Sequence, residues 1–238
     1  RELFIKTVGI RYRRVAPKSV TASDLCLAAA EKLLNEINWP RNEIQALVFI
    51  SQTPDYVIPN TASVLQQKLG LAKNCLVFDV NLGCSGYVYG LSIIGSILRN
   101  IPGGKGLLLV GDVSTHTISG NDKSTTPLFS DAGSATALQV SGAGAMYFNL
   151  QTDGSDSDDI MVPDGGFRNR VNAASFDVQE YDKGVYRTNL DMKLDGLKIF
   201  NFALREIAPN IELLLAENKF EKEVIDYFVF HQANLLML

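Results

Sequence analysis

The chain has 238 residues, of which 46% are hydrophobic and 20% are charged, and its formal net charge is -4. This is the composition of a globular protein, and the length suits one large domain or two smaller ones that share a core. The acidic balance and the absence of a dense basic run in the sequence argue against nucleic acid as a partner.

The three cysteines, Cys26, Cys75 and Cys84, are an odd set without paired spacing. This argues against a disulfide framework, and without a CxxC pair we expect no metal site. We therefore expect a reducing, cytoplasmic setting. The first residues lack the apolar core of a signal peptide, and the longest apolar helical pattern is shorter than the ~18 residues of a membrane span, so we expect no membrane partner.

In chain order, the hydrophobic pattern alternates between helix and strand periods. An amphipathic segment that Thr21 or Ser23 can cap precedes a continuous apolar run, which is typical of a strand buried on both faces, and the alternation then repeats. The predicted helices cover residues 20–37, 61–69, 85–98 and 196–217, and the predicted strands lie at 46–51, 75–80, 104–112, 131–141, 145–153 and 227–234.

This alternation predicts βαβ crossovers and a mostly parallel sheet. A weak internal echo links the stretch "EIQALVFISQ" (43–52) with "EVIDYFVFHQ" (223–232), and it hints at two copies of one α/β unit. Residues 154–175 are rich in Gly, Asp, Ser and Asn, and we expect them to form a long surface loop.

Cys84 lies where a buried strand ends and a helix is expected to begin. The carboxyl end of a strand is where open α/β sheets place their sites, and a helix N-terminus favours the thiolate. Gly83 and Gly86 allow a sharp turn beside it, as in a nucleophile elbow. The alternative is a buried, inert thiol, which is our interpretation of Cys26 and Cys75.

His231 closes the last predicted strand and thus occupies a position like that of Cys84. A neutral imidazole there can donate a hydrogen bond to a developing oxyanion or act as a base. The alternative is a strand-end histidine that bonds to the backbone. His116 lies in a polar loop, and we interpret it as structural or solvated.

Several motifs resemble segments of one known family. "DVNLGCSGYVYGL" (79–91) resembles the active-cysteine segment of the thiolase superfamily, closest to β-ketoacyl-ACP synthase III, and "HQAN" (231–234) resembles its histidine motif. Further segments match in order and spacing, namely "VGIRYRRVAP", "PNTASVLQQKLGL", "LFSDAGSATAL" and "LDGLKIFNFAL". The resemblance covers essentially the whole chain.

The resemblance implies a thiolase-like α/β fold, in which two similar halves form αβαβα layers. Residues 1–142 would be the half with the nucleophilic cysteine, and 143–238 an incomplete second half with HQAN. It also implies the family's reaction, without a cofactor. Cys84 would take an acyl group from an acyl-CoA, and malonyl-ACP would lose carbon dioxide and attack the thioester. His231 would stabilise the enolate, and the protein would be a homodimer.

The same resemblance assigns residues for binding substrate. Arg168 or Arg170 would serve the CoA phosphates, and Gly196 and Phe200 align near the pantetheine tunnel. Ile58 aligns with a residue that crosses the dimer interface into the partner's acyl pocket. Asn234 belongs to the HQAN motif and is grouped with the binding residues.

The chain also departs from the family pattern. The sequence ends before the family's catalytic asparagine motif and its glycine-rich closing segment, and it lacks the first strand, so we expect a fragment. Leu3 and Thr7 replace the tryptophan and arginine that hold the CoA adenine.

Three alternatives stay open at this point. The first is a thiolase-superfamily synthase of secondary metabolism, and the second is a non-catalytic partner subunit. The third is a hydrolase of the Cys–His–Asn type, which the close spacing of His231 and Asn234 disfavours.

Overall fold

The computed structural model describes residues 2–142 and 144–237, which divide into two compact units. The cysteine unit comprises Arg14–Ser114 and Ser130–Met146, and the histidine unit comprises Arg1–Arg13, Thr115–Phe129 and Tyr147–Leu238. The predicted division into halves at residue 142 stays a prediction.

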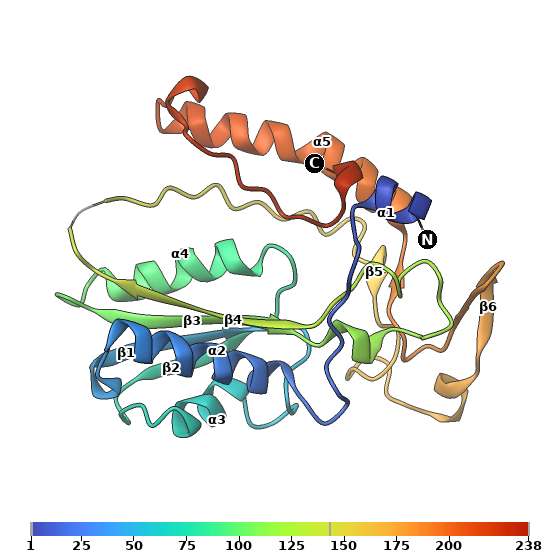
Figure 1. Ribbon diagram of the computed structural model, residues 1–238, viewed down its shortest axis with the longest axis horizontal. Helices are drawn as coiled ribbons and strands as arrows, with labels where there is room; N and C mark the ends of the chain where they lie inside the picture. The colour runs from blue at the N-terminus through green and yellow to red at the C-terminus, as the bar shows by residue number, and fades with distance from the viewer. Residues whose placement is uncertain (1, 143, 238) are drawn as a thin grey trace. The chain divides into compact units, whose positions relative to one another are not determined.

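The cysteine unit is built on a four-stranded sheet in the order β2-β1-β3-β4 (Figure 1). β1 runs parallel to both β2 and β3, whereas β4 is antiparallel to β3. The strands are β1 (Ile44–Ile50), β2 (Leu76–Val80), β3 (Lys105–Asp112) and β4 (Ala132–Gln139). The parallel-rich sheet predicted from the alternation of helices and strands is confirmed.

Both faces of the central strand β1 are covered, which explains its continuous apolar sequence. Leu47 and Phe49 belong to the core cluster on one face, while Val48 and Ile50 belong to the cluster on the other. Each fully buried side chain of this size contributes about 1.5–3 kcal/mol to folding. The burial of β1 on both faces therefore contributes several kcal/mol to the stability of this unit.

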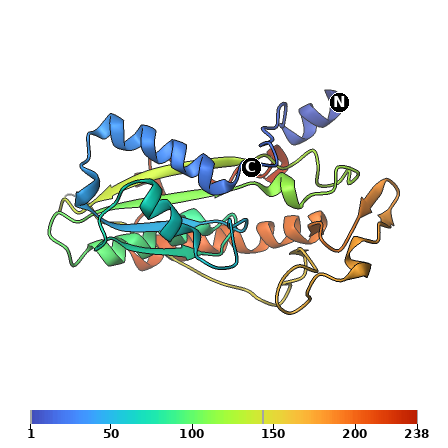
Figure 2. The same cartoon turned by 90° about the horizontal axis from the view of Figure 1, so that it is seen from below.

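Three helices complete the layers of the cysteine unit. The apolar stripes of α2 (Ala22–Ile37) and α3 (Thr61–Lys68) pack on the face with Leu47 and Phe49, and α4 (Gly86–Leu98) packs on the opposite face. Figure 1 shows the sheet between these helices, and Figure 2 views it from the side of α2 and α3. These three predicted helices are confirmed to within a few residues.

A glycine lets α4 approach the sheet closely. A Cβ atom at Gly90 would lie 2.5 Å from Leu108 Cδ1 and 2.6 Å from Ile50 Cδ1. A larger residue would therefore push the helix away from β1 and β3. Only residues 81–85 separate the end of β2 from the first residue of this helix.

The histidine unit holds smaller elements. These are α1 (Glu2–Val8), the antiparallel pair β5 (Ile160–Met161) and β8 (Lys193–Leu194), the hairpin of β6 (Gln179–Asp182) and β7 (Val185–Arg187), and α5 (Gly196–Glu217). Gly184 has φ +75° in the two-residue hairpin turn, where a side chain would be strained. The short 3-10 helices of the chain are η1 (Arg41–Glu43), η2 (Ser114–Thr117), η3 (Ala173–Phe176), η4 (Lys222–Val224) and η5 (Leu235–Met237).

Two predicted strands are wrong. Neither 145–153 nor 227–234 is a strand in the structure, although both carry strand-like sequences. A strand exists through the hydrogen bonds of a neighbouring ladder, and among the described residues no strand pairs with either segment. The bounds of α5 match the predicted helix, but none of its residues is buried, so its apolar side lacks the expected cover.

Candidate active site

Cys84 lies in a tight turn between the end of β2 and the start of α4. The Leu82 N–H donates to Val80 O at 3.2 Å, and the Gly86 N–H donates to Gly83 O at 2.8 Å. The Cys84 side chain is exposed at the carboxyl end of a parallel strand. The predicted position, at the end of a strand and the start of a helix, is confirmed.

The three cysteines have different surroundings. Burial raises the pKa of Cys26 to about 12 and that of Cys75 to about 11, and both side chains are buried. They therefore stay protonated at neutral pH, as expected of packing residues. Cys84 is exposed and lies just before the N-terminus of α4, where backbone N–H groups and the helix dipole favour negative charge.

A carboxylate at the end of β3 fixes the loop beside Cys84. Asp112 Oδ1 accepts hydrogen bonds from Ser51 Oγ at 2.9 Å and from the Gln52 N–H at 2.7 Å, and Thr53 donates to it through its N–H and its hydroxyl. The Gln52 side chain in turn lies against Gly83, since a Cβ there would be 2.5 Å from Gln52 Oε1. Asp112 thus holds the residue that packs on the cysteine turn.

Sequence reasoning missed Asp112 and Gln52. The signal was available, because each of these polar residues lies at or shortly after the end of an apolar strand, as Cys84 does. Carboxyl ends of neighbouring parallel strands meet at one edge of the sheet. Their shared hydrogen bonds, however, depend on the spatial order of the strands, which one sequence does not give.

A second carboxylate fixes the far end of the same loop. Asp79 accepts the Thr61 N–H and the Ala62 N–H at the start of α3, each at 2.7 Å. Between the two anchors, Ile58 is 85% exposed, and Tyr56 and Val57 beside it are exposed as well. The residue predicted to reach a partner's acyl pocket therefore lies at the tip of a loop with fixed ends.

The HQAN segment belongs to the histidine unit. His231 is exposed in a stretch without regular secondary structure. The Leu236 N–H donates to Asn234 Oδ1 at 3.0 Å, and the Met237 N–H donates to Asn234 O at 3.2 Å, so Asn234 orders the start of η5. The meeting of Cys84 with His231 stays a prediction.

The remaining predicted binding residues lie at separate places in the histidine unit. Arg168 and Arg170 are exposed, and the Arg170 guanidinium lies 5.2 Å from the centroid of the Phe167 ring. Gly196 is the first residue of α5, and Phe200 is half-buried one turn later. Their roles stay predictions.

Within residues 2–142 and 144–237, no three His, Cys, Asp or Glu side chains gather as metal ligands would. Over the same residues, no helix has both the length and the hydropathy needed to cross a bilayer. The expected absence of a cofactor stays a prediction.

The fold and the cysteine turn define a class of α/β protein with an exposed thiol at a helix N-terminus, and comparisons with known proteins name the family. A family profile described as 3-oxoacyl-[acyl-carrier-protein (ACP)] synthase III matches residues 78–154. The β-ketoacyl-ACP synthase III of Streptococcus mutans is 31% identical over 100% of this chain and 70% of its own length. The Chlamydia caviae enzyme of the same name is 31% identical over 98% of this chain and 68% of its own length.

Solved structures agree with this assignment. A 3-oxoacyl-ACP synthase III crystal structure superposes with a TM-score of 0.95 at 35% identity, covering 100% of this chain and 71% of that one. A 3-oxoacyl-ACP synthase from Burkholderia xenovorans gives a TM-score of 0.86 at 38% identity, covering 100% and 66%. The expected thiolase-like α/β fold is confirmed.

The chain belongs to the 3-oxoacyl-ACP synthase III family, whose members are acyltransferases that initiate fatty acid synthesis. It spans about two thirds of the length of the curated relatives that it matches. These relatives do not favour the alternatives of a secondary-metabolism synthase or a non-catalytic partner subunit.

Proposed function

We propose that the protein catalyses the decarboxylating condensation of an acyl-CoA, acetyl-CoA in the first instance, with malonyl-ACP. The observation that carries the proposal is the exposed Cys84 thiol at the N-terminus of α4, in a chain of this family. Splitting the condensation at a cysteine gives two steps, each easier than the direct reaction.

In the first step, the Cys84 thiolate attacks the thioester carbon of the acyl-CoA. The carbon–sulfur bond to CoA breaks, CoA leaves as its thiolate and takes up a proton, and the acyl group is now a thioester of Cys84. The backbone N–H of Cys84 and the start of α4 stabilise the oxyanion formed on the acyl carbonyl. The Asp112 network supports this step because it holds Gln52 against the turn.

In the second step, the malonyl group of malonyl-ACP loses carbon dioxide and becomes an enolate. His231 donates a hydrogen bond to the thioester oxygen, where the negative charge develops. The enolate carbon attacks the acyl carbon on Cys84, and the sulfur leaves as the thiolate. The product is a 3-oxoacyl-ACP, and the cysteine is ready for another cycle.

The remaining substrate contacts are assigned by position. Arg168 and Arg170 supply exposed positive charge for the CoA phosphates. Gly196 and Phe200 border the path of the pantetheine arm, with Asn234 ordering the HQAN segment. Leu3 and Thr7 offer no aromatic face or guanidinium to the adenine, so adenine binding is weaker than in relatives that carry the aromatic clamp.

The protein acts as a cytoplasmic homodimer. Three observations support this arrangement: the apolar loop tip at Ile58 is exposed, β2 forms one edge of the described sheet, and the buried cysteines are thiols. An exposed strand edge and an apolar loop tip are surfaces that a second subunit covers. Ile58 would then help to set the length of the acyl group that the partner accepts.

Intact-protein mass spectrometry after incubation with acetyl-CoA tests the proposal. We expect one acetyl adduct, which peptide mapping assigns to Cys84 and which malonyl-ACP then discharges as a 3-oxoacyl-ACP. Cys84→Ser should abolish the adduct, and Cys75→Ser should retain it. An adduct on Cys26 or Cys75, or no adduct from either acetyl-CoA or acetyl-ACP, contradicts the proposed reaction.

A further inference from the structure

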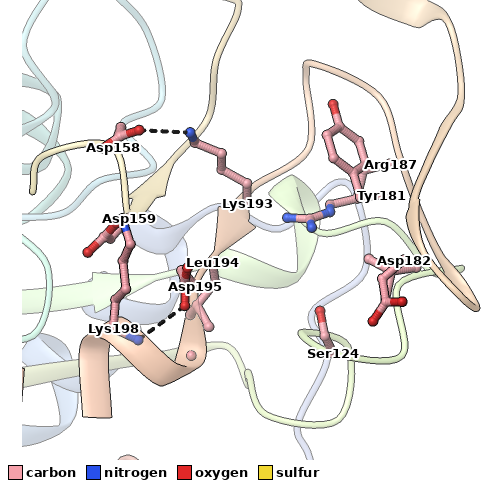
Figure 3. Close-up of a pocket in the computed structure, with 12 residues that line it drawn as sticks. Ser124, Asp158, Asp159, Tyr181, Asp182, Arg187, Lys193, Leu194, Asp195 and Lys198 are labelled. Carbon is pink, nitrogen blue, oxygen red and sulfur yellow. Dashed lines mark hydrogen bonds and ion pairs between the residues drawn. The ribbon is translucent and has the colours of Figure 1, made fainter. Parts of the chain in front are cut away.

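The histidine unit contains a cavity of about 440 Å³ that the proposed reaction does not use as a whole. Its walls come from the loop at Ser124, the hairpin β6–β7, the strand β8 and the first turn of α5 (Figure 3). This volume lies within the range of small-molecule sites. All of these segments belong to one compact unit.

Arg187 on β7 is the most unusual group in this cavity. The residue is only 9% exposed, and its Nε lies 3.3 Å from Oδ2 of the fully buried Asp122. The Tyr181 ring stacks on the guanidinium, with its centroid 4.7 Å from Cζ. The arginine is therefore held in place from two sides before any ligand binds.

One end of this guanidinium lacks an acceptor. Arg187 Nη1 is buried and has no hydrogen-bond partner within residues 2–142 and 144–237, and Figure 3 shows the guanidinium directed into the cavity. Leaving a buried charged donor unsatisfied costs more free energy than leaving a neutral one unsatisfied. A ligand oxygen at this point would remove that cost.

The other charged side chains of the cavity have partners within the histidine unit. Lys198 bonds to Asp159 at 2.8 Å, and Lys193 lies 3.6 Å from Asp158. The carboxylates of Asp195 and Asp182 accept the backbone N–H groups of Lys198 and Lys183. Lys198 is about half exposed, so water can reach its remaining donors, whereas the unsatisfied donor of Arg187 is buried.

The balance of charge limits which anion fits. The lining carries one more carboxylate than cations, so a dianion such as phosphate is repelled more strongly than a monoanion. A planar carboxylate also matches the planar guanidinium. Beside Arg187, Val185 and Leu194 supply apolar wall, which favours a short hydrocarbon part on the ligand.

We propose that this cavity binds a small carboxylic acid with a short apolar chain, whose carboxylate accepts a hydrogen bond from Arg187 Nη1. The site is separate in its chemistry from thioester exchange, because it holds a free carboxylate. It does not depend on Cys84 reacting.

Isothermal titration calorimetry with butyrate at neutral pH tests the site, with inorganic phosphate as the comparison anion. We expect saturable butyrate binding, with phosphate at least about 10-fold weaker. Arg187→Met alone would leave Asp122 buried without its counter-charge, so the double variant Arg187→Met/Asp122→Asn is the one to use. It should weaken butyrate binding by about 10-fold or more.

Lys32→Met is the matched control, since it removes one exposed positive charge on α2 and should leave butyrate binding unchanged. Three results overturn the proposal: no saturable butyrate binding by the native protein, phosphate binding as tight as butyrate, or equal butyrate affinity in the folded double variant. Because the experiment measures butyrate binding, its result does not depend on whether the protein catalyses the proposed condensation.

Discussion

Two stretches of this chain have nearly the same sequence pattern and different structures. Residues 43–52 and 223–232 both place a Val-Phe pair in an apolar run that ends before a glutamine. In the first stretch Val48 is fully buried in β1, with a strand on each side. In the second, Val229 is 86% exposed and belongs to no strand.

The comparison teaches that an apolar run forms a strand only where neighbouring strands pair with it. The preference of its own backbone is not enough. β1 exchanges hydrogen bonds with β2 and β3 and is covered by helices on both faces. No described strand pairs with 227–230. The same two side chains can therefore contribute several kcal/mol in one place and little in the other.

The largest expected effect separates the two units by chemistry. Cys84→Ser in the cysteine unit should remove the acyl adduct and lower condensation by at least about 10³-fold, because the nucleophile is lost. His231→Ala in the histidine unit should leave the adduct intact and lower decarboxylation by about 10²–10³-fold. Adduct formation is followed by mass spectrometry and carbon dioxide release by a coupled assay. Loss of both steps in the His231 variant would break the proposed division of labour.

The next prediction compares the stability contributed by two phenylalanines at matching positions of the two stretches. Phe49→Ala should lower the free energy of unfolding by about 3–5 kcal/mol, because a fully buried ring leaves a cavity. Phe230→Ala should cost less than about 1 kcal/mol, since that ring is 43% exposed. Urea denaturation of both variants gives the two values. Equal losses would mean that burial is not what distinguishes the stretches.

The pH dependence of stability should distinguish the buried Cys26 from the exposed Cys84 within the cysteine unit. Burial raises the pKa of Cys26 from 9.0 to about 12. Below pH 9 the thiol is protonated in both the folded and the unfolded state. Above it the unfolded chain loses its proton first, so stability falls as the pH rises from 9 towards 12. Cys26→Ala should flatten this part of the unfolding curve, whereas Cys84→Ala should leave it unchanged.

The smallest expected effect is the loss of a helix N-cap, which should cost a similar free energy in the two units. Thr21 caps α2 by accepting the Asp24 N–H, and Asp195 caps α5 by accepting the Lys198 N–H. Replacing either residue by alanine should cost about 0.5–2 kcal/mol, because a cap acts on its own first turn. Hydrogen exchange of the first-turn amides reports each loss. A clear difference between the helices would show that tertiary cover decides the value of a cap.

The sequence pattern was informative where local chemistry sufficed. The apolar run of β1, the Thr21 cap of α2, the bounds of α5 and the turn that presents Cys84 could all be predicted from neighbouring residues. The family motifs added the fold and the order of its parts.

The rest could not be predicted, because it depends on groups far apart in the chain. Asp112 reaches the loop at Gln52 only through the spatial order of β1 and β3. Arg187 meets Asp122 because the hairpin β6–β7 docks on a distant loop. The apolar residues of 227–230 look like a strand, and their periodicity carries no information about whether a neighbour exists.

The loop between β1 and α3 has a consequence for how the protein can diversify. Asp112 holds the beginning of this loop and Asp79 holds its end. The side chains between these anchors are exposed at Tyr56, Val57 and Ile58. Residues at this tip can be exchanged without disturbing the sheet or the cysteine turn. The tip can therefore vary in sequence during evolution while the turn that presents Cys84 keeps its geometry, and under the proposed role of Ile58 such variation would change the acyl groups that are accepted.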